Sequence, residues 1–317
     1  MKRITAFTSH EKFSWIQAIG ASLGLIVASF FLPGGDDLYR YYIPFDEGCL
    51  NCGFVPYFAQ WFLFPLRLLP DYPLAWPVWT ILSVVLFMAL AYFTGVNPFL
   101  FMISFPLLGQ IWLGQIDVLV CSGMVIFLLA KNPYWRGVGI ILALTKPQLT
   151  ALPLVFAFLL ESPGLSWKLF VAPILVFLAS LAVYGVTWPV DWISNSLKGL
   201  PEHVWRLAGK DIWKFGVFLL PIPFLIKDQR KRFEAGLLVS ALATPFFGVY
   251  SYVIFLLIDV RGWWVVLSYV WLLGFFWLQE SAMRFAWILP FTMLAWLLYE
   301  EFKPHNVENL VQQDGPR

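Results

Sequence analysis

Runs of about twenty apolar residues constrain this 317-residue chain more than any other feature. The first spans about residues 13–32 and the second about residues 75–94, and a helix needs roughly 20 such residues to cross a bilayer. Hydrophobic residues make up 60% of the chain and charged residues only 13%, against roughly a quarter in soluble domains. A membrane barrel would instead show alternating segments of about ten residues. We therefore expect an all-α polytopic transmembrane protein with about 10–12 membrane segments, several of them short or broken.

The chain divides into one hydrophobic domain and a short polar tail. Residues 1–300 are predicted to form a single transmembrane domain, and residues 301–317 a polar C-terminal tail. Residues 33–74, between the first two apolar runs, form the first long loop. Its apolar stretch 54–66 is interrupted by prolines and is too short to span, which indicates an interfacial helix lying along the membrane.

Basic residues predict the orientation. Lys2, Arg3 and Lys12 precede the first run, and cytoplasmic loops of membrane proteins are enriched in Lys and Arg. We therefore expect a multi-pass protein of a bacterial-type inner or plasma membrane, with a cytoplasmic N-terminus. The loop at residues 33–74 is then extracytoplasmic.

Two short hairpins are predicted in the middle of the chain. Residues 98–130 are too long for one crossing and carry the polar sequence Gly109–Asp117 in their middle, which predicts a hairpin tip. Residues 137–160 form either one span or two short helices that reverse at Lys146. The choice decides on which side of the membrane each later loop lies. The segment 227–232 carries four basic residues, which indicates a cytoplasmic loop and favours the reversal.

Two carboxylates, Asp36 and Asp37, follow the first apolar run directly after Pro33-Gly34-Gly35. Carboxylates at a membrane surface need partners or a function. Either residue can serve as a general base, with Asp37 as the first candidate and Asp36 as the second. The alternative is a solvated helix N-cap. The pair is also compatible with a divalent cation, although no dense acidic cluster requires a metal.

The predicted topology brings further polar residues to the same side of the membrane. A set of polar and basic residues on one side of a membrane fits transfer of a sugar from a lipid phosphate. This reaction needs cations that hold the leaving phosphate and polar groups that hold the substrates. The candidates for substrate and phosphate binding are Arg40, Gln115, Asp117, Lys146, Gln148, His203, Arg206, Lys210 and Tyr250.

Six of these candidates also have a structural interpretation. Lys146 can extend to the interface, and Gln115 and Asp117 can hold helices together. Arg206 and Lys210 fit a basic interfacial stripe, and His203 fits an ordinary surface residue.

The two loop cysteines, Cys49 and Cys52, leave three alternatives open: free thiols, a disulfide, or part of a metal site.

The order of several short motifs resembles the GT-C superfamily of membrane glycosyltransferases, most closely glycosyltransferase family eighty-seven, which uses polyprenol-phosphate-mannose. The motifs that carry the resemblance are Asp37-Leu38-Tyr39-Arg40-Tyr41-Tyr42, the proline-rich stretch 57–70, Gly114-Gln115-Ile116-Asp117 (where the family has Asn in place of Asp117), Lys146-Pro147 and Thr244-Pro245. Together they cover about residues 10–260.

The resemblance implies an inverting hexosyltransferase with an extracytoplasmic active site, and mannose is the first candidate for the hexose. Its donor would be a polyprenyl-phosphate sugar and its acceptor the hydroxyl of a lipid or glycan. Asp37 would be the general base, and Lys146 would face the donor phosphate. Where the family often places His after the Thr-Pro element, this chain has residues 249–252, Val-Tyr-Ser-Tyr.

Two other interpretations of the chain's function are a lipid-linked glycan flippase and a catalytically silent subunit of a membrane complex. No feature of the chain indicates a nucleic-acid partner.

Overall fold

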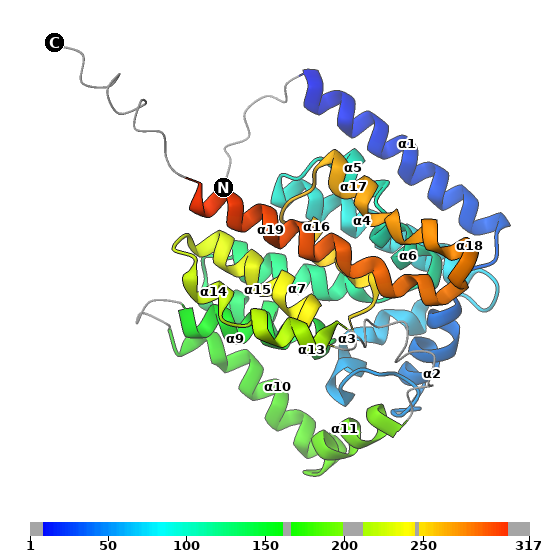
Figure 1. Cartoon of the computed structure of the whole chain (residues 1–317). Coiled ribbons are helices and arrows are strands. Elements are labelled where there is room, and N and C mark those ends of the chain that lie inside the picture. Colours follow the sequence, from blue (N-terminus) through cyan, green and yellow to red (C-terminus); the bar gives the residue numbers. More distant parts are fainter. Residues whose placement is uncertain (1–8, 161–165, 199–211, 245–246, 304–317) are drawn as a thin grey trace.

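The computed structural model describes residues 9–160, 166–198, 212–244 and 247–303. Within these ranges helices are the only regular secondary structure and no strand occurs, as the apolar runs predict (Figure 1). Helices are the expected solution, because a spanning segment must satisfy its backbone hydrogen bonds internally.

Two long helices match the first two apolar runs. Helix α1 spans Ser9–Phe31 and helix α4 spans Ala75–Thr94, and the two pack against each other. Helix α1 stops just before Pro33, whose ring cannot continue a helix. Helix α4 ends at Gly95, which has a φ of 73°, a conformation that glycine adopts without strain.

The loop between α1 and α4 folds into short helical turns. These are η1 (Leu38–Tyr42), α2 (Ile43–Asp46), η2 (Tyr57–Ala59), α3 (Gln60–Leu63) and η3 (Phe64–Leu68). The last three replace the single interfacial helix predicted at residues 54–66, and Pro65 lies where α3 gives way to η3. A disulfide joins Cys49 to Cys52, so of the three alternatives the structure has the disulfide.

The two segments predicted as hairpins fold into short helices. These are α5 (Pro98–Met102), α6 (Phe105–Leu113), α7 (Asp117–Leu129), α8 (Pro133–Ala143) and α9 (Pro147–Leu160). Arg136 near the start of α8 and Phe156 in the second half of α9 both line one cavity at one end of the bundle. Lys146, which lies between the two helices in the sequence, contacts Gln115 at the other end. Residues 137–160 are therefore two short helices that reverse at Lys146-Pro147.

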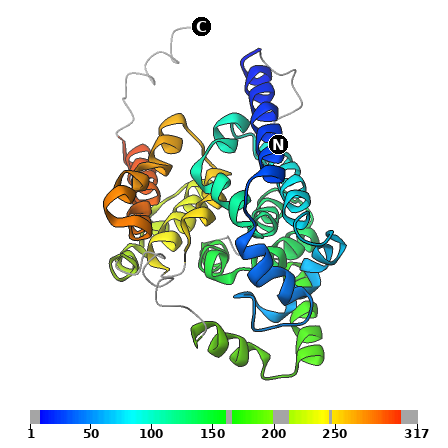
Figure 2. The ribbon, with the colours of Figure 1, turned by 90° about the vertical axis from the view of Figure 1, so that its right-hand side faces the viewer.

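The following segment bends sharply. Helix α10 (Lys168–Tyr184) and helix α11 (Trp188–Lys198) meet at 84°, so that α11 turns away along the lower edge of the bundle (Figures 1 and 2). After the undescribed residues 199–211, the chain continues through α13 (Trp213–Gly216), η4 (Val217–Leu219), α14 (Ile222–Leu225) and α15 (Gln229–Ala243).

The C-terminal part is more broken than predicted. The apolar runs at about residues 263–278 and 285–298 predict two helices joined by a short turn. The structure instead has η5 (Val249–Tyr252), α16 (Val253–Leu256), α17 (Gly262–Ser268), η6 (Val270–Gly274), α18 (Phe275–Leu278), η7 (Gln279–Trp287) and α19 (Ile288–Phe302). Tertiary hydrogen bonds hold the first break, because Ser268 Oγ accepts from Phe105 N at 3.1 Å and Tyr269 OH donates to Ile103 O.

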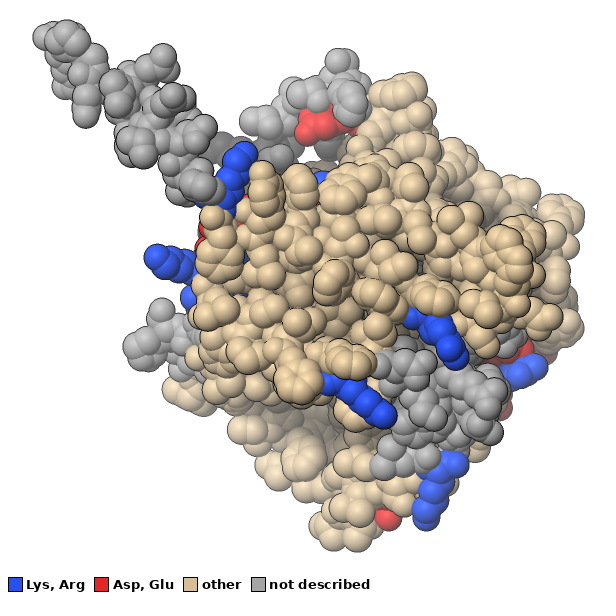
Figure 3. All heavy atoms as spheres, in the orientation of Figure 1, with Lys and Arg blue, Asp and Glu red and all other residues tan. Residues whose placement is uncertain are grey.

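Three described helical segments are long and apolar enough to cross a membrane, and the bent pair α10–α11 would make a fourth. The remaining apolar helices are shorter. Most of the visible surface is uncharged, and charged side chains gather toward its upper left and lower right (Figure 3). Large apolar side chains such as Phe177, Leu178 and Val183 are exposed on α10. These features are typical of an integral membrane protein.

Candidate active site

Two glycines bring the first loop into contact with the hairpin tip. Gly35 N donates to Trp112 O at 2.8 Å, and Gly114 lies against Gly35 and Leu38. Gly114 has a φ of 69°, and a Cβ there would lie 2.7 Å from Leu38 Cβ. Only glycine fits where the first loop and the hairpin tip come this close. Their close approach places Asp37 opposite Gln115.

Gln115 joins three other side chains. Its Nε2 donates to Asp37 Oδ2. Its Oε1 accepts from Tyr42 OH at 2.7 Å and from Lys146 Nζ at 2.5 Å. Gln115 is buried, so these hydrogen bonds are shielded from water and strengthened. One amide therefore links the carboxylate of the first loop to the cation at the α8–α9 turn.

Lys146 is in turn held by Asp117. The two side chains form an ion pair and are both buried, with 6% and 0% of their side-chain surface exposed. Asp117 Oδ2 also accepts from Gln110 Nε2 and from Ser251 Oγ, each at 2.6 Å. Both carboxylate oxygens of Asp117 therefore have partners, as a buried polar group requires. The ion pair excludes the interpretation of Lys146 as a side chain that extends to the interface.

The pKa of Asp37 is raised from 3.8 to about 6. Burial is the main cause, and the neighbouring charge of Asp36 adds to it. The cation of Lys146 and the hydrogen bond from Gln115 act in the opposite direction and keep the pKa from rising further. A general base works best when its pKa lies near the working pH, which Asp37 approaches.

Asp36 and Arg40 form a separate pair on the outer side of this loop. Arg40 Nε lies 2.8 Å from Asp36 Oδ1, and both side chains are more than half exposed. The N-cap interpretation is not supported for Asp37, whose side chain makes no capping hydrogen bond to the following helical turn. Of the two carboxylates, only Asp37 contacts the buried cluster.

The structure brings together four of the predicted site residues, Asp37, Gln115, Asp117 and Lys146. A fifth, Tyr250, lies beside them, with the centroid of its ring 5.7 Å from Lys146 Nζ. The other candidates are not seen in this cluster within the described residues. Arg40 pairs with Asp36, Gln148 is partly exposed on α9 and takes no part in these hydrogen bonds, and His203, Arg206 and Lys210 lie outside the described residues.

Three residues of the cluster were missed from the sequence. Tyr42 belongs to the motif that contains Asp37. Gln110 belongs to Gly109-Gln110, a pair that recurs as Gly114-Gln115, so this repetition of polar residues in an apolar run was an available signal. Ser251 follows Tyr250 and had no comparable signal. Among the residues that the structure describes, no group of three metal-ligating side chains occurs.

Comparison with known proteins identifies the family. The model of glycosyltransferase family 87 matches residues 56–216, which is half of the chain. The chain belongs to glycosyltransferase family 87. No curated protein and no solved structure matches it. This family 87 chain is therefore a membrane glycosyltransferase of the GT-C type, as its motifs predict.

The family match covers only part of the cluster. Gln115, Asp117 and Lys146 lie within the matched residues of this family 87 chain, whereas Asp37 precedes them and Ser251 follows them. The fold supplies the missing connection, because all five residues meet in one hydrogen-bonded group. The cluster is therefore the candidate active site.

Proposed function

We propose that this glycosyltransferase moves a hexose from a polyprenyl-phosphate donor to an acceptor hydroxyl on the extracytoplasmic side of the membrane. The observation that carries the proposal is the chain of contacts from Asp37 through Gln115 to Lys146. It places a carboxylate with a pKa of about 6 next to a buried cation, at the end of the first predicted spanning helix. Base and cation are the two groups that such a transfer needs.

Asp37 accepts the proton of the acceptor hydroxyl as the hydroxyl oxygen attacks the anomeric carbon of the sugar. The bond between that carbon and the phosphate oxygen breaks, and polyprenyl phosphate leaves with the electron pair. Attack from the face opposite the phosphate inverts the configuration of the sugar carbon. Asp37 is half-buried, so a substrate can reach it while Gln115 holds its other oxygen.

Lys146 stabilises the phosphate as negative charge grows on it. The ion pair with Asp117 fixes the position of Lys146 before substrate arrives. The rings of Tyr42 and Tyr250 lie 5.4 Å and 5.7 Å from Nζ and limit access of water to the cation. The lipid tail of the donor remains in the bilayer, which accounts for a site built at the ends of membrane helices.

The purified protein in proteoliposomes tests this proposal. Polyprenyl phosphate carrying a labelled hexose, with mannose first, is supplied with a membrane lipid extract as acceptor. A matched reaction contains the same hexose on a nucleotide. We expect transfer from the polyprenyl phosphate alone, and a product whose anomeric configuration is opposite to that of the donor.

Other outcomes are informative. Transfer from the nucleotide sugar would overturn the proposed donor, and retention of configuration would overturn the one-step mechanism. Movement of an intact lipid-linked glycan across the bilayer without transfer would favour a flippase. If several hexoses were tested and the protein showed no transfer and no movement of the glycan, a silent subunit would be favoured.

A further inference from the structure

A cavity lies at the end of the bundle opposite the candidate site. Its volume is about 430 Å³, and it is bordered by the ends of α4, α7, α8, α9 and α15. Leu129 lines it and lies about 18 Å along α7 from Asp117, at 1.5 Å per residue. Ligand sites in proteins have volumes of about 300–1,000 Å³, so the cavity can hold part of a ligand. The cavity does not border the Asp37 cluster.

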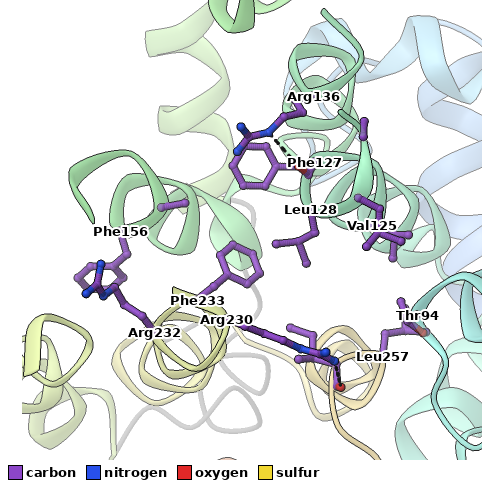
Figure 4. Close-up of a pocket in the computed structure, with 14 residues that line it drawn as sticks. Thr94, Val125, Phe127, Leu128, Arg136, Phe156, Arg230, Arg232, Phe233 and Leu257 are labelled. Carbon is purple, nitrogen blue, oxygen red and sulfur yellow. Dashed lines mark hydrogen bonds between the residues drawn. The ribbon is translucent and has the colours of Figure 1, made fainter. Parts of the chain in front are cut away.

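Three arginines supply the charge of this cavity. Arg136 extends from the start of α8, and Arg230 and Arg232 extend from the first turn of α15 (Figure 4). Arg230 and Arg232 belong to the basic segment that the candidate active site does not use. The arginines come from different elements yet surround one space, so the fold gathers their charges.

Contacts with the backbone hold each guanidinium in place. Arg136 Nε donates to Phe127 O at 3.1 Å, and its guanidinium carbon lies 4.8 Å from the centroid of the Phe127 ring. Arg230 Nη2 donates to Ile258 O at 3.3 Å, and Arg232 Nε donates to Ile226 O at 2.8 Å. Guanidinium groups fixed in this way lose little entropy when they bind a phosphate, which they can contact with paired hydrogen bonds.

The remaining walls are apolar. Phe233 and Leu128 point into the space between the arginines (Figure 4). Leu128 and Leu129 are 43% and 52% exposed, so this apolar wall is accessible from outside the protein. A soluble anion would gain nothing from these apolar walls, whereas a lipid presents a phosphate and hydrocarbon together.

We propose that this cavity binds the headgroup of an anionic phospholipid from the leaflet opposite the candidate active site. The phosphate lies among Arg136, Arg230 and Arg232, and the first part of an acyl chain packs on Leu128 and Phe233. Basic pockets between membrane helices bind acidic headgroups in this way. The inference rests on the geometry of the cavity and does not depend on the reaction assigned to Asp37.

Native mass spectrometry of the purified full-length protein tests the proposal. The probes are phosphatidylglycerol and phosphatidylcholine with identical acyl chains. We expect wild type to bind phosphatidylglycerol at least about tenfold more tightly, because arginine–phosphate contacts are charge-assisted and the choline headgroup cancels the charge of its phosphate. The triple variant R136Q/R230Q/R232Q is expected to lose this preference.

Lys227→Gln is the matched control. It removes one positive charge from the same basic segment, but Lys227 does not line the cavity, so the preference for phosphatidylglycerol should remain. Equal binding of the two lipids by wild type, or an unchanged preference in the triple variant, would overturn the proposal. Displacement of phosphatidylglycerol by an equal concentration of inorganic phosphate would also overturn it and indicate a soluble anion.

A photoactivatable phosphatidylglycerol gives a second readout on wild type alone, which matters if the triple variant does not fold. We expect crosslinks in residues 125–136 and 229–233 that excess unlabelled phosphatidylglycerol suppresses. Crosslinks spread evenly along the exposed helices, without suppression at these two segments, would contradict a defined site.

Discussion

Asp37→Asn is expected to lower the rate of hexose transfer by about 10²–10⁴-fold, the usual contribution of a general base. Asparagine has almost the same shape and can still accept a hydrogen bond from Gln115, but it cannot take the proton of the acceptor hydroxyl. Because the substitution keeps the contacts of the loop, the loss should appear in kcat and not in expression or folding. Initial rates of labelled hexose transfer in proteoliposomes measure it.

Asp36→Asn is the matched control. Asp36 is the adjacent carboxylate, but it is exposed and pairs with Arg40 outside the cluster. Its replacement should change the rate by only a few-fold. If Asp36→Asn abolished transfer and Asp37→Asn did not, the catalytic base would be Asp36, and the role assigned to the Gln115 contact would be wrong.

Lys146→Met is expected to destabilise the protein by about 3–5 kcal/mol, the usual cost of removing one partner of a buried ion pair. Methionine preserves most of the apolar stem of lysine, so the main effect is electrostatic. Asp117 would be left as a buried carboxylate with hydrogen bonds from Gln110 and Ser251 but no countercharge. Thermal unfolding in detergent, followed by tryptophan fluorescence, measures the loss.

The double variant K146M/D117N separates structure from function. Asparagine at position 117 removes the uncompensated charge and can still accept from Gln110 or Ser251, so most of the lost stability should return. Transfer should remain undetectable, because no cation faces the phosphate. A double variant that regained both stability and transfer would show that Lys146 has only a structural role.

The sequence predicts the helices well where apolar runs have clear ends. Helix α4 spans Ala75–Thr94 as expected, because its run is uniformly apolar and ends at Gly95. The reversal at Lys146 was also predicted, from the proline that follows it and from the basic residues at 227–232. The C-terminal segment was predicted less well, since its breaks at residues 268–269 depend on hydrogen bonds to the distant α5–α6 segment.

The candidate site was predicted as a set of residues but not as an arrangement. Polar side chains within apolar runs or directly after them identified Asp37, Gln115, Asp117 and Lys146, since such residues are costly in a membrane protein and need a partner or a function. Their pairing depends on the close approach of Gly35 and Gly114, which no local pattern specifies. The structure pairs Arg40 with Asp36, and its assignment to the substrate stays a prediction.

The pH dependence of kcat/KM tests the central claim most directly, because this parameter reports the ionisation of groups in the free enzyme. Asp37 must be deprotonated to act as a base, and its pKa is raised to about 6, so transfer should fall about tenfold per unit as the pH drops below that value. The hydrogen bond from Gln115 lowers this pKa, so Gln115→Leu should move the acid limb to higher pH. An acid limb near 6 that moves upward in Gln115→Leu is the predicted result. Transfer that stayed constant down to pH 5, or a limb that did not move in the variant, would contradict the assignment of Asp37.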